Sequence, residues 1–134
     1  MKKRYKKKIY DIKIVTDIFF VILGMTVMLF FMFISAIVIS RLGLMYKTEV
    51  ILAELSLCAG CFTSGFFYAV FKRKNGIYNG FINSLRIYLL IFITGLVLTD
   101  SIEISLIPLR FAGAALSGMS GGFYGVNSKL KKPA

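Results

Sequence analysis

Four long apolar runs divide this chain and limit what it can fold into. They cover residues 18–40, 50–71, 77–99 and 104–126, and none of them contains more than one charged residue. A helix needs about 20 such residues to cross the hydrocarbon core of a bilayer. Each run reaches that length, so the pattern predicts an all-α fold, a polytopic four-helix transmembrane bundle.

The composition argues against several classes of soluble protein. Hydrophobic residues make up 57% of the 134 residues with glycine left out, whereas soluble domains reach about half only when glycine is counted. The 17 Lys and Arg residues outnumber the 6 Asp and Glu residues, and they gather between the apolar runs. A soluble enzyme, a disulfide-stapled secreted domain and a freely diffusing nucleic-acid-binding protein all fit poorly. The sequence predicts a small integral membrane protein whose first partner is the lipid bilayer, with no nucleic acid partner.

The distribution of cations predicts how the chain lies in the membrane. A single domain, residues 18–126, is expected between a basic arm, 1–17, and a basic tail, 127–134. Lys and Arg resist translocation, and most of them fall in the arm, the tail and the turn between the second and third runs. Short connections make neighbouring helices antiparallel. We therefore expect an up-down-up-down, multi-pass protein of the cell membrane with both termini in the cytoplasm.

The first residues of the arm form a dense block of cations. Such a block beside a membrane attracts anionic lipid headgroups. Nucleic acid is the weaker alternative as a partner, because a short tethered arm has no folded nucleic-acid-binding motif. We expect a solvated, disordered arm that binds anionic lipid through Lys2, Lys3, Arg4, Lys6, Lys7 and Lys8.

Small residues recur at every fourth position in the last three runs. In lipid, helices associate through close packing and hydrogen bonds, and small residues four apart let two backbones approach. Packing within one chain is the favoured interpretation, and a homo-oligomer or an unidentified membrane protein partner is the alternative. The expected contact residues are Gly60, Gly65, Gly80, Gly113, Ser117, Gly118, Gly121, Gly122 and Gly125.

The first run is built differently from the other three. It is rich in large residues, among them Phe19, Phe30 and Phe33, and Gly24 is its one glycine. Close approach of backbones in a membrane depends on small residues. We therefore expect the second to fourth runs to form the tight core and the first run to be more exposed to lipid.

Two opposite charges fall at similar depth in the second and fourth runs. Glu54 lies about 6 Å and Arg110 about 9 Å from the same predicted face of the membrane, at 1.5 Å per residue. An ionisable residue inside a span is costly and is a functional hypothesis by default. We predict an intramembrane Glu54–Arg110 ion pair. It either only fixes the register of two helices, which is favoured, or forms a gate or an ion-coupling site.

A third charge, Arg86, lies about 14 Å from the cytoplasmic end of the third run. It shares a helical face with Asn79 and Asn83, and Asn127 ends the fourth run at the same side. No acid is expected at this depth. The four residues are predicted to form a polar cluster on the cytoplasmic side, either as hydrogen-bonded packing, which is favoured, or as a site for an anion or a lipid headgroup.

Catalytic motifs are scarce in this sequence. Cys58 and Cys61 have the C-x-x-C spacing of thiol–disulfide chemistry, but they lie inside a predicted span and suit packing better. There is no histidine, so the usual zinc and haem sites are not expected. We predict no enzyme activity, no catalytic residues, no cofactor and no metal.

The glycine pattern resembles a known family. The second run from Gly60 to Gly65, the basic turn Lys72-Arg-Lys-Asn-Gly76, Gly80 and the ending Gly118-Met-Ser-Gly-Gly-Phe-Tyr-Gly-Val-Asn127 resemble the YrzE-like putative membrane proteins of Gram-positive bacteria. The resemblance covers residues 15–128. It implies four helices in a bacterial cytoplasmic membrane and supplies no activity.

Three functions remain open on the sequence. The favoured hypothesis is a non-enzymatic structural or accessory subunit that associates through its glycine-rich helices. The alternative is a small homo-oligomeric transporter or channel that uses Glu54, Arg86 and Arg110. A membrane thiol oxidoreductase built on Cys58 is a distant third.

Overall fold

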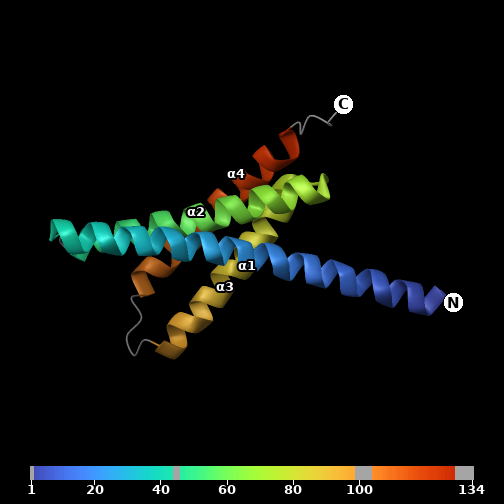
Figure 1. Cartoon of the computed structure of the whole chain (residues 1–134), viewed down its shortest axis with the longest axis horizontal. Helices are drawn as coiled ribbons and strands as arrows, with labels where there is room; N and C mark the ends of the chain where they lie inside the picture. The colour runs from blue at the N-terminus through green and yellow to red at the C-terminus, as the bar shows by residue number, and fades with distance from the viewer. Residues whose placement is uncertain (1, 44–45, 99–103, 129–134) are drawn as a thin grey trace.

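The computed structural model describes residues 2–43, 46–98 and 104–128. The described chain is all-α and forms a four-helix bundle (Figure 1), which confirms the all-α, four-helix part of the predicted fold class. The helices are α1 (Lys2–Leu42), α2 (Tyr46–Lys72), α3 (Gly76–Leu98) and α4 (Ile107–Asn127), and a 3₁₀ turn, η1 (Ile104–Leu106), precedes α4.

Three of the helices are long and apolar enough to cross a membrane, judged by length and composition. These segments are Lys13–Leu42, Lys47–Lys72 and Gly76–Leu98. They indicate a multi-pass membrane protein. The predicted fourth span, 104–126, corresponds to η1 and to α4. The many glycine and serine residues among the 21 residues of α4 lower its mean hydropathy. A fourth crossing, like the direction of insertion, stays a prediction.

The basic arm is helical, and the expectation of a disordered arm is wrong. Helix α1 begins at Lys2 and continues for 41 residues, so no helix end falls at residue 17. Lys and Arg are good helix formers. An adjoining span also removes the nucleation cost, because each added residue then gains a hydrogen bond on an existing helix. As a result, α1 extends past the other helices at its N-terminal end (Figure 1).

Backbone conformation closes two of the connections tightly. Gly43 ends α1 with φ of +57°, and its N–H donates to the carbonyl of Ile39 at 3.0 Å, the usual role of glycine after a helix. Between α2 and α3, Arg73 and Asn75 also adopt positive φ, 48° and 46°. In α4, Pro108 lies in the first turn, where its missing N–H is tolerated.

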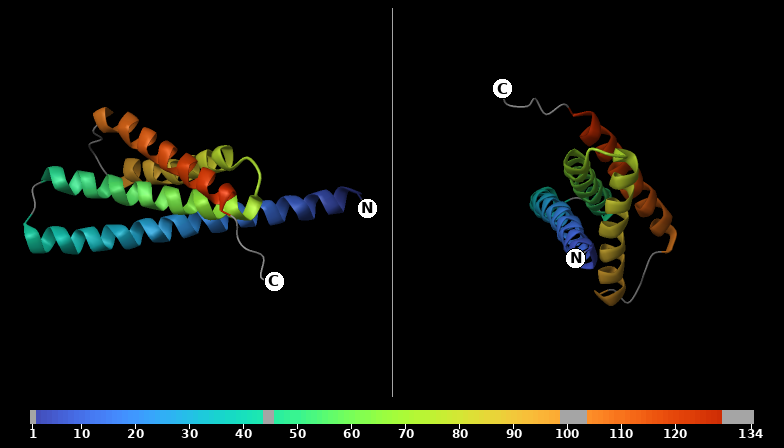
Figure 2. Two further views of the ribbon diagram at one scale, coloured as in Figure 1. Left: turned by 90° about the horizontal axis from the view of Figure 1, so that it is seen from above. Right: turned by 90° about the vertical axis from the view of Figure 1, so that its right-hand side faces the viewer.

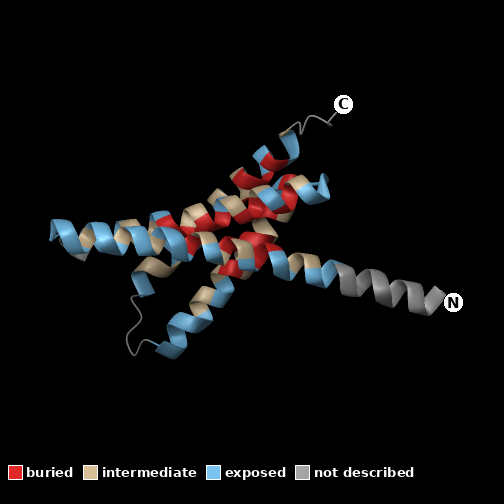
Figure 3. Cartoon of the chain, viewed as in Figure 1, coloured by how far each residue is buried: buried red, intermediate tan, exposed pale blue. Residues whose placement is uncertain are grey.

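The tight core forms where α2, α3 and α4 meet. Helix α4 packs along both α2 and α3, while α1 packs mainly on α2 and meets α3 only briefly. Within the described ranges, α1 and α4 make no contact. The two views in Figure 2 show α1 outside the other three helices. Figure 3 colours most of the C-terminal half of α1 exposed and a stretch in its middle buried, and Phe33 is 67% exposed. The prediction that the first run is the most exposed is confirmed.

Candidate functional site

One line of small residues on α4 faces α2. A Cβ atom added at Gly121 or Gly125 would collide with the backbone carbonyl of Phe62 or Phe66, respectively. Gly113 lies on the same line but has more room, because its Cβ would meet only the Cys58 Sγ, at 3.4 Å. The predicted small-residue line is therefore a helix contact, and it tightens toward the C-terminal half of α4.

The second line of small residues on α4 faces α3. Gly118 and Gly122 lie against the backbone of Gly80 and Gly76, and a Cβ at Gly118 would lie 2.8 Å from the Gly80 carbonyl oxygen. Gly118 also reaches α2, since a Cβ at Gly65 would lie 2.6 Å from its carbonyl oxygen. The glycines of α4 thus hold three backbones together inside one chain.

Helix α1 joins this core at a single close crossing. A Cβ at Gly60 would lie 2.8 Å from the Gly24 carbonyl oxygen, and one at Gly24 would lie 2.6 Å from the Ser64 Cβ. Phe20 and Met28, four residues before and after Gly24, are also buried against the other helices. The predicted contact glycines therefore all lie at contacts within this chain.

The predicted contact between Glu54 and Arg110 is confirmed. Arg110 Nε on α4 donates to Glu54 Oε1 on α2 at 2.7 Å. The Arg110 side chain is 45% exposed and that of Glu54 is 22% exposed. The pair therefore neutralises two costly charges at the edge of the α2–α4 contact, and part of the guanidinium stays open to the surroundings.

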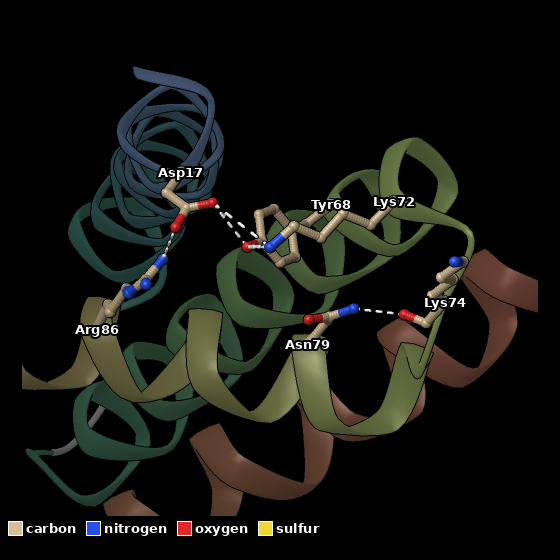
Figure 4. Close-up of polar contacts among 6 residues, drawn as sticks. All are labelled: Asp17, Tyr68, Lys72, Lys74, Asn79 and Arg86. Carbon is tan, nitrogen blue, oxygen red and sulfur yellow. Dashed lines mark hydrogen bonds and ion pairs between the residues drawn. The ribbon is translucent and has the colours of Figure 1, made fainter. Parts of the chain in front are cut away.

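A second ion pair involves an acid that was not expected. Arg86 Nη1 on α3 lies 2.9 Å from Asp17 Oδ2 on α1. The other carboxylate oxygen, Oδ1, accepts a hydrogen bond from the Tyr68 hydroxyl at 2.6 Å and lies 3.8 Å from Lys72 Nζ (Figure 4). Lys72 also donates to the Tyr68 hydroxyl. One carboxylate therefore joins α1, α2 and α3.

The expectation that Arg86 has no acidic partner is wrong for a structural reason. Asp17 stands one residue before the first apolar run, so it was assigned to a disordered arm. Because α1 is helical throughout, Asp17 has a fixed place beside α2 and α3. The signal in the sequence was an acid at the N-terminal end of the first apolar run and an arginine in the N-terminal half of the third.

The predicted cluster of Asn79, Asn83, Arg86 and Asn127 does not form. Asn79 donates to the Lys74 carbonyl and so fastens the α2–α3 turn, pointing away from Asp17 (Figure 4). Asn127 is exposed at the end of α4, and no hydrogen bond in the described part of the chain links it to either asparagine. Asn79, Asn83 and Arg86 share one face of α3, but each finds a different partner along it: the α2–α3 turn, α2 and α1, respectively.

Asn83 belongs instead to a buried polar chain across three helices. Its side chain is fully buried, and its Nδ2 donates to Ser64 Oγ on α2. Ser64 Oγ in turn donates to the Phe20 carbonyl on α1 at 2.7 Å. Hydrogen bonds between helices of this kind fix register in a membrane bundle.

The two cysteines are free thiols that help to fill the core. Cys61 is fully buried and Cys58 is partly buried. Among the described residues, no group of three or more His, Cys, Asp or Glu side chains is placed to hold a metal ion. The polar side chains described above therefore form ion pairs and hydrogen bonds between helices.

The geometry and composition together define a helical protein with three candidate membrane spans. No family model, curated protein or solved structure matches the chain. The resemblance to the YrzE-like family stays a prediction.

Proposed function

We propose that this chain is a non-catalytic integral membrane protein, a structural or accessory subunit of the cell membrane. The observation that supports this most is the use of the α4 glycines. Gly118, Gly121 and Gly122 bring α4 against the backbones of α2 and α3, so the centre of the bundle is occupied by helix contacts. The glycine-rich helices then serve to build a rigid unit.

In this proposal the partner binds on α1. Most of the α1 surface is free of the other helices, and it presents Phe30 and Phe33 to the membrane, 62% and 67% exposed. Helix α4 also has an outward residue, Leu116, which is 66% exposed and offers a matched control. The proposal requires a discrete protein along α1, either a second copy of the chain or a different membrane protein.

In-cell photocrosslinking tests this proposal. A photoreactive residue at Phe33 should give one adduct of discrete mass, whereas the same residue at Leu116 should give none. The purified chain reconstituted alone in liposomes should move no solute. Solute movement by the purified chain, or equal adducts at both positions, would contradict the proposal.

A small homo-oligomeric transporter or channel is the second candidate. It is favoured by the two ion pairs, Asp17–Arg86 and Glu54–Arg110. Asp17 contacts α2 near its C-terminal end, at Tyr68 and Lys72, whereas Glu54 lies nearer its N-terminal end. The two pairs are therefore about 20 Å apart along α2, at 1.5 Å per residue. Partly exposed pairs in this arrangement suit gates on the two sides of a membrane.

Flux measurements separate this candidate from the first. If Glu54 and Arg110 gate a path, Glu54→Gln and Arg110→Gln should each change ion flux in liposomes, and the exchanged pair Glu54→Arg with Arg110→Glu should restore part of it. Flux indistinguishable from empty liposomes for the unmodified chain and all three variants would eliminate the transporter.

A further inference from the structure

A groove separates α1 from α3 beyond the point where the two helices meet. It has a volume of about 520 Å³, and it opens because α3 diverges from α1 (Figures 1 and 2). Most of its wall is aliphatic, with Ile18, Val21, Ile22, Met25, Leu89 and Leu90 among the lining residues. Asp17 and Arg86 line the same groove.

Charge is confined to one end of this groove. Both helices run from the end that carries the α2–α3 turn, and Asp17 and Arg86 come before most of the aliphatic lining residues on their helices. The groove is therefore polar at the end closer to the turn and apolar farther along. This distribution suits a phospholipid whose headgroup lies at the polar end and whose acyl chain lies along the apolar part.

The ion-pair cluster at the polar end carries an excess of positive charge; Asp17 and Arg86 line the groove, and Lys72 contacts Asp17 from outside the lining. The single carboxylate of Asp17 faces two cations, Arg86 and Lys72, so the cluster keeps a net charge of about +1. The Arg86 side chain is 42% exposed and that of Lys72 is 35% exposed. A guanidinium has five N–H donors, and the ion pair with Asp17 leaves several of them for a further acceptor.

We propose that the groove between α1 and α3 binds an anionic phospholipid, with its phosphate on Arg86 and an acyl chain along the aliphatic walls, while Lys72 adds positive charge nearby through its contact with Asp17. Basic pockets between membrane helices recognise anionic headgroups in this way. The charge argues against a second copy of the chain as the occupant, because each copy brings the exposed cations Arg73 and Lys74 at the same end. The proposal does not depend on the accessory-subunit function.

Tryptophan fluorescence provides the test, because the chain contains no tryptophan. Leu90→Trp places one reporter in the groove, and Leu116→Trp places a control on the outer face of α4. Each full-length variant is reconstituted in vesicles that contain either brominated phosphatidylglycerol or brominated phosphatidylcholine at equal mole fraction. Bromine quenches the reporter only when the lipid lies against it.

We expect the quenching of Leu90→Trp to show that the groove binds the anionic lipid about fivefold more strongly than phosphatidylcholine, which is the contribution of one cation near anionic lipid. The outer reporter should be quenched equally by both lipids. Arg86→Gln in the groove-reporter background should abolish the preference, Arg86→Lys should restore part of it, and Arg110→Gln should leave it unchanged.

The groove reporter also yields the outcomes that would overturn the proposal. Equal quenching by both lipids would show that the groove has no headgroup site. Protection from both lipids would show that protein covers it. A preference that survives Arg86→Gln would place the anionic lipid elsewhere on the chain.

Discussion

The carboxylate of Asp17 connects more helices than any other side chain in the Asp17–Tyr68–Lys72–Arg86 cluster. Its two oxygens contact Arg86 on α3 and both Tyr68 and Lys72 on α2. The side chain is 21% exposed, so solvent or headgroups screen these contacts only in part. Removing its charge would leave two cations facing each other across the α1–α2–α3 junction.

Asp17→Asn should therefore destabilise the bundle. We expect a loss of about 1–2 kcal/mol, because hydrogen bonds to a charged group contribute about that much and exposure lowers the value for a fully buried pair. Unfolding of the reconstituted protein by denaturant measures it. Glu49→Gln, at an exposed acid on α2, is the matched control and should be neutral.

A double variant separates this ion pair from a general effect of lost charge. Asp17→Asn combined with Arg86→Gln should cost less than the sum of the two single losses, since each single change leaves the other partner without its counter-charge. Strict additivity, or an Asp17→Asn protein as stable as the unmodified one, would contradict the role given to Asp17.

Sequence reasoning at the residue scale succeeded for one ion pair and failed for the other. Glu54 and Arg110 both lie inside apolar runs, where depth can be counted from the nearest end, and the pair forms. Asp17 lies just outside its run, where hydropathy marks a boundary that the helix does not have. Only the continuity of α1 and its tilt over α3 bring Asp17 to Arg86.

At the scale of the helix, glycines on one element differ in what they contact. Gly121 on α4 lies against the Phe62 carbonyl, a backbone group that cannot rotate away, whereas Gly113 on the same face has only the Cys58 thiol near it. Gly95 on α3 has open space within 4 Å. Periodicity alone treats such residues as equivalent.

Alanine substitutions should separate these positions. Gly121→Ala should destabilise the bundle by about 1–3 kcal/mol, the usual cost of overpacking. Gly95→Ala should stabilise it by up to about 1 kcal/mol, because alanine favours a helix over glycine by that amount, and Gly113→Ala should lie between the two. Denaturant unfolding in one common detergent measures all three.

The order of these variants is the decisive result. If Gly121→Ala and Gly95→Ala changed stability equally, Gly121 would not lie as close to the Phe62 carbonyl as the structure places it. The lines of small residues were predictable, because a spacing of four keeps residues on one helix face whatever they meet. Which helix each line faces was not, since it depends on crossing angles set by the whole bundle.

At the scale of the whole molecule, whether α4 crosses the membrane decides on which side of it the C-terminal end of α4 lies. Helix α4 lies along α2 and α3 through its glycines, whereas the segments of the described chain that are long and apolar enough to span a membrane lie in α1, α2 and α3. Packing on two candidate spans would compensate for weak hydropathy, since α4 would then expose only one side to lipid. We therefore expect α4 to cross the membrane with them.

Labelling of single cysteines from outside the cell tests this topology. In a background with Cys58→Ser and Cys61→Ala, an impermeant maleimide should label Lys47→Cys in intact cells. It should label Lys74→Cys and Ser128→Cys only after the membrane is opened. Lys and Arg resist translocation, so the turn with Lys72, Arg73 and Lys74 should stay inside. If Ser128→Cys reacts from outside together with Lys47→Cys, then α4 does not cross. If Lys74→Cys alone reacts from outside, the cation bias does not set the orientation.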